Sequence, residues 1–294
     1  MPGPWTGVAG AVAGPSAVRP AGLLSAVAGR AVRFAVAFGA TRVAHGQLRR
    51  RPPGNPESWE RTNHAGRTVH AQAGAAVAFG TALAALPGAP AVLATVAGAV
   101  CGRHDDLRGD ERRGFRAHLT ALRDGEVTSG AVKLLGIGAA GLAAGALLNE
   151  RPLDKVLAGV VVAGTAHLVN LVDVRPGRAG LLVLGLGAPG LLRGSLAAVP
   201  MGAAAAVLAD DLAERTMLGD MGAHALGAAL GTAVAAVNGR LGLAVSGDRS
   251  GRRCGVRRAK GDEGPPAGGW GRVRGLARAS APAPALTRVG EPGR

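Results

Sequence analysis

Apolar blocks alternate with short polar loops along most of the chain. Each block is about as long as the hydrocarbon core of a bilayer is thick, whereas a soluble domain would spread its apolar residues with a shorter period. The pattern predicts an all-α fold, a polytopic transmembrane helix bundle of about eight spans. We place the spans near residues 21–44, 71–86, 88–102, 131–149, 155–172, 179–193, 195–209 and 222–245, and a first span that begins earlier, near Gly7, also fits.

Small residues dominate these blocks, because the chain has 49 Gly but only 4 Phe and no Tyr. In lipid, Gly and Ala let helix backbones approach closely, so this composition favours a closely packed bundle. We divide the chain into an N-terminal segment (1–20), a transmembrane domain (21–245) and a basic Gly/Arg/Pro-rich tail (246–294). The tail lacks a hydrophobic period, as expected either of a disordered segment or of an out-of-frame product of a GC-rich gene.

Basic residues indicate membrane orientation more than a nucleic-acid partner. The net charge is +15, and residues 246–294 hold 11 of the 34 Lys and Arg residues. Most of the others lie in short loops between apolar blocks, such as 49–67 and 103–130, and basic loops mark the cytoplasmic side of a membrane. We therefore expect a multi-pass protein of the cell membrane and no nucleic-acid partner.

Three carboxylate motifs lie at the ends of apolar blocks. Carboxylates beside membrane spans are costly unless they have a function, so each motif is a candidate site. With eight spans, all three motifs fall on the cytoplasmic face. Carboxylates on one face indicate a site for a divalent cation and a phosphorylated substrate. The motifs are His104-Asp105-Asp106, Asn170-Leu171-Val172-Asp173 and Gly219-Asp220.

Each motif also has a plainer interpretation when it is taken alone. Asp105-Asp106 fits the start of a solvated loop, Asp173 fits a weak interfacial ion pair, and Asp220 fits a charge at a helix N-terminus. We expect Asp210 and Asp211 to lie in a solvated loop, with a role as auxiliary metal ligands as the alternative. Lys133 fits a side chain that extends from its span to the membrane surface. The three histidines beside the motifs lack ligand spacing and fit structural, hydrogen-bonded residues: His104, His167 and His224.

Four motifs in order give the chain a family resemblance. Asn63 begins an Asn-x-x-Gly-x-x-Val pattern, the paired aspartates and the Asn-x-x-Asp motif follow, and Gly219-Asp220-Met221-Gly222-Ala223 comes last. Over about residues 45–240 these motifs resemble those of the polytopic polyprenyl-phosphate N-acetylhexosamine-1-phosphate transferases. The intervening stretch from Gly125 to Lys133 also resembles that family, particularly its actinobacterial members. That family includes the phospho-N-acetylmuramoyl-pentapeptide transferase and the UDP-N-acetylglucosamine-1-phosphate transferases.

The resemblance implies transfer of a sugar 1-phosphate from a UDP-N-acetylhexosamine to a membrane polyprenyl phosphate. UMP is released, and the product feeds cell-wall or cell-envelope glycans such as peptidoglycan. It also implies Mg²⁺, with Mn²⁺ as an alternative, to neutralise the diphosphate. The implied roles are metal binding for Asp220 and Asp173, catalysis for Asp105, Asp106 and Asp173, and substrate binding for Asn63, Lys133, Asn170 and Gly222.

The chain departs from the family pattern in two places. Ala223 stands where the last motif has Ser, and nothing after Val245 resembles the last two of the family's ten spans or the His-rich loop between them. We therefore expect the glycines of the last predicted span to face lipid: Gly227, Gly231, Gly239 and Gly242. Two other function classes stay open: a non-catalytic relative with the same fold, and a small cation- or proton-coupled transporter. A homodimer also stays open.

Overall fold

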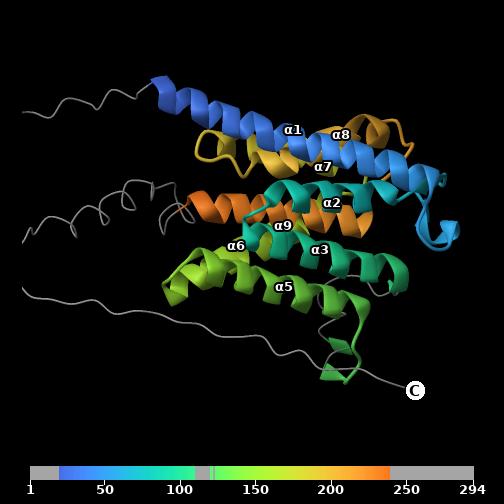
Figure 1. The fold of residues 1–294 in the computed structure, drawn as a ribbon. Helices are drawn as coiled ribbons and strands as arrows, with labels where there is room; N and C mark the ends of the chain where they lie inside the picture. The colour runs from blue at the N-terminus through green and yellow to red at the C-terminus, as the bar shows by residue number, and fades with distance from the viewer. Residues whose placement is uncertain (1–19, 110–119, 122, 239–294) are drawn as a thin grey trace, which may run out of the picture. The chain divides into compact units, whose positions relative to one another are not determined.

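The computed structural model describes residues 20–109, 120–121 and 123–238. Within these residues the chain forms eight α-helices and a two-stranded antiparallel sheet (Figure 1). The sheet pairs β1 (Glu60–Thr62) with β2 (Thr68–His70), after a 3-10 helix at Pro56–Trp59. The helices are α1 (Pro20–Arg50), α2 (Gln72–Ala85), α3 (Ala89–Arg108), α5 (Ser129–Leu148), α6 (Pro152–Val172), α7 (Arg178–Leu191), α8 (Ala198–Leu212) and α9 (Gly219–Val237).

Each of the eight predicted blocks coincides with a helix over most of its described residues, so the prediction of a mostly helical fold is confirmed. Among the described residues, three helices are long and apolar enough to cross a membrane: α5, α6 and α9. The helices α2 and α7 are apolar but shorter. The predicted tail at 246–294 and almost all of the segment 1–20 lie outside the described residues, as does the end of the eighth predicted span.

Proline and a capping threonine define where the helices beside the site begin. Pro90 and Pro152 lie in the first turns of α3 and α6, where a backbone N–H has no partner within the helix. The Thr128 hydroxyl accepts the N–H of Ala131 at 3.1 Å and so caps α5. This cap fixes the start of α5 and places Lys133 about one turn inside the helix.

Helix α9 is the central helix of the described bundle. It is buried along most of its length and packs against α2, α3 and α6 (Figure 1). Helix α5 packs on α3 and α6, while α1 packs on α2 and α8. The expectation that Gly227 and Gly231 face lipid is wrong, because both lie against the backbone of α6. Their missing side chains allow this close approach.

Candidate functional site

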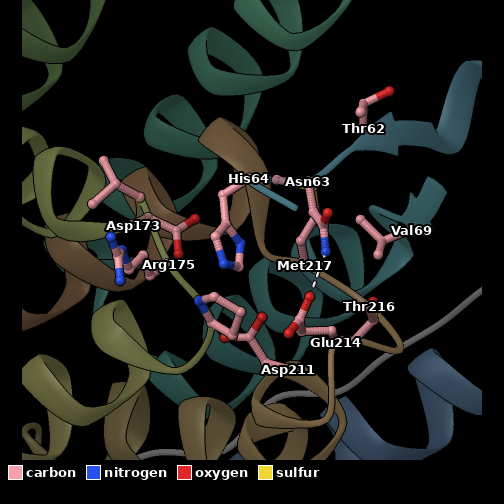
Figure 2. Close-up of a pocket in the computed structure, with 12 residues that line it drawn as sticks. Thr62, Asn63, His64, Val69, Asp173, Arg175, Asp211, Glu214, Thr216 and Met217 are labelled. Carbon is pink, nitrogen blue, oxygen red and sulfur yellow. Dashed lines mark hydrogen bonds between the residues drawn. The ribbon is translucent and has the colours of Figure 1, made fainter. Parts of the chain in front are cut away.

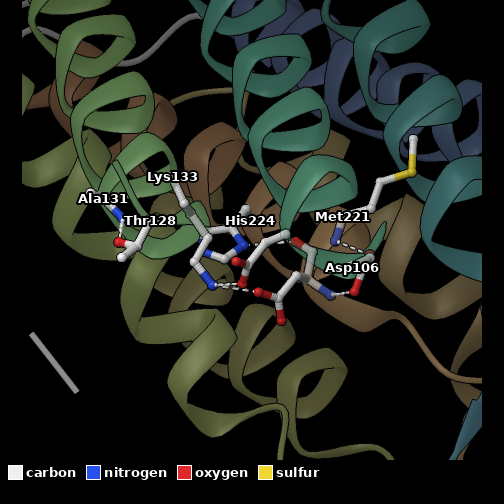
Figure 3. A network of polar contacts seen from close by, with 8 residues as sticks. Asp106, Thr128, Ala131, Lys133, Met221 and His224 are labelled. Carbon is white, nitrogen blue, oxygen red and sulfur yellow. Dashed lines mark hydrogen bonds and ion pairs between the residues drawn. The ribbon is translucent and has the colours of Figure 1, made fainter. Parts of the chain in front are cut away.

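Three helix ends converge on one ion-paired group. The carboxylates of Asp105, near the end of α3, and Asp220, in the first turn of α9, both contact the ammonium group of Lys133 on α5. Figure 3 shows Lys133 within this polar network, beside Asp106 and His224. The side chains are partly buried, with exposed fractions of 16% for Lys133, 18% for Asp105 and 27% for Asp220. The structure therefore brings together three residues that the sequence analysis selected from separate motifs.

Asp106 has a different geometry from its neighbour Asp105. Its Oδ1 accepts the N–H of Asp220 and its Oδ2 accepts the N–H of Met221, each at 3.1 Å. These two N–H groups belong to the first turn of α9, which lacks a capping side chain of its own. Asp106 is thus a capping residue from a distant segment, and its negative charge also suits the positive end of the helix dipole.

Gly219 makes this cap sterically feasible. Its φ of +61° lies in the left-handed region, which a residue with a Cβ adopts at a cost. A Cβ at this position would also lie 3.3 Å from both carboxylate oxygens of Asp106. Both constraints favour glycine immediately before Asp220.

A β-hairpin is attached to the same end of the bundle. Arg61 of β1 donates a hydrogen bond to the Asp106 carbonyl oxygen at 2.8 Å. After β2, the Thr216 hydroxyl and the Met217 N–H both donate to the His70 carbonyl oxygen. The hairpin thereby links the end of α3 to the loop between α8 and α9.

The hairpin and this loop border a cavity of about 100 Å³. Asp173, which follows α6 directly, lines it together with Asp211 of α8 (Figure 2). Asn63, His64 and Glu214 also line it. The cavity thus contains two further residues that the sequence analysis selected, Asn63 and Asp173.

Asp173 has a strongly perturbed carboxyl group. Burial, together with the nearby negative charges of Asp211, Asp220 and Asp106, raises its pKa to about 8. Its carboxyl group is therefore largely protonated at neutral pH in the absence of a bound cation. A cation nearby would favour the ionised form.

Asn63 has a mainly structural role in this conformation. Its side-chain oxygen accepts the N–H groups of Ala65 and Arg67, each at 2.9 Å, and so shapes the hairpin turn. Its amide nitrogen donates to Glu214 Oε2 at 2.6 Å. These bonds use much of the hydrogen-bonding capacity of Asn63, which leaves less for the substrate role that was predicted.

The end of α8 and the loop after it contribute two acidic residues to the cavity, Asp211 and Glu214, which the sequence did not identify as site residues. Glu214 adopts a left-handed φ of +54° and forms an ion pair with Arg67, whose hydrogen bond lowers the pKa of the Glu214 carboxyl group. Asp211 Oδ2 accepts the N–H of Gly177 at 2.9 Å. The sequence contains a signal for these residues, because both acids lie at the end of an apolar block, as the three selected carboxylate motifs do.

The prediction that Asp210 and Asp211 lie in a solvated loop is wrong. Both belong to α8 and are buried, with exposed fractions of 8% and 4%. Asp210 pairs with Arg42 of α1 at 2.9 Å and with Arg215 at 2.7 Å. Burial is tolerated because each carboxylate has charged or N–H partners, which a solvated loop would not require.

Three other residues considered in the sequence lie in α6 and α9. Asn170 is in the last turn of α6, where its carbonyl oxygen accepts the N–H of Asp173. Gly222 packs against Gly74 of α2, so it serves close helix packing. His224 is fully buried, and its Nδ1 donates to the Asp220 carbonyl oxygen at 2.7 Å, as expected of a structural histidine.

The donor set suits a hard divalent cation, although Lys133 holds the central position. Within the described part of the chain, no three His, Cys, Asp or Glu side chains are grouped as a complete metal site. Mg²⁺ does not need three, because it binds through one or two carboxylates, with waters and substrate phosphates completing its shell. Asp105 and Asp220 share one cationic group, the Lys133 ammonium, and carboxylate oxygens are the type of ligand that Mg²⁺ binds.

Comparison with known proteins gives no assignment: the chain matches no protein-family model and no curated protein sequence.

Proposed function

We propose that this protein is a membrane phosphoglycosyl transferase. It transfers an N-acetylhexosamine 1-phosphate from a UDP-sugar to a polyprenyl phosphate, in the synthesis of a cell-wall or cell-envelope glycan. A phosphate oxygen of the lipid attacks the phosphorus atom that carries the sugar. The bond from that phosphorus to the bridging oxygen breaks, and UMP leaves with the electron pair.

The observation that supports this proposal most is the ion-paired group of Asp105, Lys133 and Asp220. The three residues come from α3, α5 and α9, and nothing in their spacing along the chain requires them to meet. Phosphoryl transfer between two anions needs positive charge and fixed carboxylates at one place. The motifs that resemble the transferase family supply both here.

In this proposal Asp105 and Lys133 take part in the chemistry, and Asp173 positions the substrate. Asp105 is placed to hold or remove a proton of the lipid phosphate, because Asp106 already uses both of its carboxylate oxygens on α9. Lys133 is placed to contact a phosphate oxygen as a point charge. Asp173, in the adjoining cavity, orients the diphosphate.

Mg²⁺ would bind Asp220, together with Asp105 or Asp173. When bound, it neutralises the diphosphate and stabilises the charge that develops on the departing UMP. The carboxylates of Asp105 and Asp220 meet at Lys133, and the cavity lined by Asp173 leaves space for phosphate groups.

We further propose that the eight helices form a multi-pass membrane bundle with the site on the cytoplasmic face. The three helices long enough to cross a membrane support this arrangement. So do the exposed basic residues of the loops at the site's end of the bundle, such as Arg51 and Arg175. UDP-sugars are charged and therefore reach the site from the aqueous side.

The test is release of UMP by the purified full chain in lipid nanodiscs. UDP-N-acetylglucosamine or another UDP-N-acetylhexosamine, polyprenyl phosphate and Mg²⁺ are supplied, and EDTA should abolish the reaction. Asp220→Asn should lower the rate by at least roughly 10²-fold. A matched control is Asp124→Asn, because Asp124 is an exposed aspartate in the loop before α5. UMP release that is unaffected by Asp220→Asn would remove the metal role, and no release with any UDP-N-acetylhexosamine would favour a non-catalytic relative.

A further inference from the structure

Lys133 occupies the position at which a metal ion would be expected. Its ammonium group contacts Asp105 Oδ2 and Asp220 Oδ2 at the same time. The proposed function assigns a divalent cation to Asp220, together with Asp105 or Asp173, so Lys133 contacts the leading ligand and one of its two candidate partners. In the conformation described, the site is therefore already neutralised in part by a side chain of the protein itself.

The two carboxylates are held more firmly than the lysine. Asp220 is fixed by the bonds from Asp106 to the first turn of α9, and Gly102 of α3 lies directly against the Asp220 backbone. The separation of Asp105 from Asp220 is thus set by packing of α3 on α9. Lys133, in contrast, reaches the group through a flexible four-carbon stem.

We propose that Lys133 and a divalent cation compete for Asp105 and Asp220. While substrate is absent, Lys133 occupies both carboxylates and thereby weakens binding of the cation. This inference rests on the proposed function and concerns the regulation of the same site. An ammonium group and a divalent cation on the same two oxygens would repel each other strongly, because the side chains are only partly exposed.

The competition has a consequence for the order of binding. A cation that arrives alone must displace Lys133 and leave its ammonium group without a carboxylate partner. A cation that arrives with a diphosphate brings anionic oxygens that Lys133 can contact instead. The substrate-free protein therefore binds divalent cations weakly, and the diphosphate increases that affinity.

The experiment measures Mn²⁺ binding by electron paramagnetic resonance on the full chain in nanodiscs, with no substrate present. Lys133→Met removes the competing charge and should tighten the Mn²⁺ dissociation constant by at least about tenfold. Lys133→Arg keeps a cation there and should bind no more tightly than the parent. Asp220→Asn should abolish site binding. Lys155→Met is the matched control, because it makes the same change at the opposite end of α6 from Asp173.

Each outcome decides between the alternatives. If Lys133→Met binds Mn²⁺ no more tightly than the parent, while Asp220→Asn still abolishes binding, the competition is wrong and the metal site stands. If neither the parent nor Lys133→Met binds Mn²⁺, both the competition and the metal role are wrong. Lys133→Gln, which is neutral but polar, gives the same test if Lys133→Met does not fold.

Discussion

Asp106 and Asp220 are 114 residues apart in the sequence, yet a carboxylate oxygen of Asp106 accepts the backbone N–H of Asp220 at 3.1 Å. The other oxygen accepts the N–H of Met221. Through these bonds the end of α3 determines where α9 begins, and hence where the Asp220 carboxylate lies. The paired aspartates therefore have separate roles, with Asp105 facing Lys133 and Asp106 capping a helix.

Removal of the cap should destabilise the protein. Asp106→Ala should lower the free energy of unfolding by about 1–2 kcal/mol, because two N–H groups of α9 lose their acceptor. Asp106→Asn keeps one side-chain oxygen as an acceptor and should cost less. Thermal unfolding in detergent measures both variants, with Asp124→Ala as a control at an exposed aspartate. If Asp106→Ala is as stable as the parent, the cap has no energetic role.

Gly219 provides a second test of the same junction. Gly219→Ala should cost about 1–2 kcal/mol from the left-handed backbone alone, and its Cβ would also crowd the Asp106 carboxylate. Gly138→Ala is the matched control, since Gly138 lies in helix α5 with no atom within 4 Å of an added Cβ. That variant should be neutral or stabilised by up to about 1 kcal/mol. Equal unfolding temperatures for the two variants would contradict the constraint at Gly219.

The sequence allowed the helices to be predicted, but not their contacts. Apolar blocks between polar loops indicated where the eight helices lie, of which three are long and apolar enough to cross a membrane. Lys133 lies between Asp105 and Asp220 because of how α5 is rotated about its own axis against α3. The local pattern of residues along α5 does not determine that rotation. The burial of Asp211 was not predicted, because an acid at a helix end is buried only where a distant group pairs with it, here the N–H of Gly177.

Asp173 should make stability depend on pH. Its pKa is about 8 in the folded protein, against about 3.9 in an unfolded chain, so between these values the folded state holds one more proton at this site. Raising the pH through this window therefore lowers the free energy of unfolding. Asp173→Asn has no titrating group at this position, so its stability lacks this pH dependence. The unfolding temperature of the parent should fall relative to that of Asp173→Asn between pH 5 and pH 8, and parallel curves would contradict a raised pKa.

The orientation of α6 offers a test that is independent of catalysis. Glu150 lies just before α6 and Arg175 just after it, both are exposed, and α6 is long and apolar enough to cross a membrane. If α6 spans the bilayer, the two positions lie on opposite sides. Each residue is replaced by a single cysteine in a background without Cys101 and Cys254, and intact cells are treated with an impermeant thiol reagent.

The proposed orientation predicts labelling at position 150 in intact cells and labelling at position 175 only after the membrane is opened. The reason is electrostatic, because Arg175 and Arg178 follow the span and basic flanks stay on the cytoplasmic side. Labelling of both positions in intact cells would mean that α6 does not cross the membrane. The reverse pattern would place Asp173 and its cavity on the outer face, away from cytoplasmic UDP-sugars, and would contradict the transferase proposal.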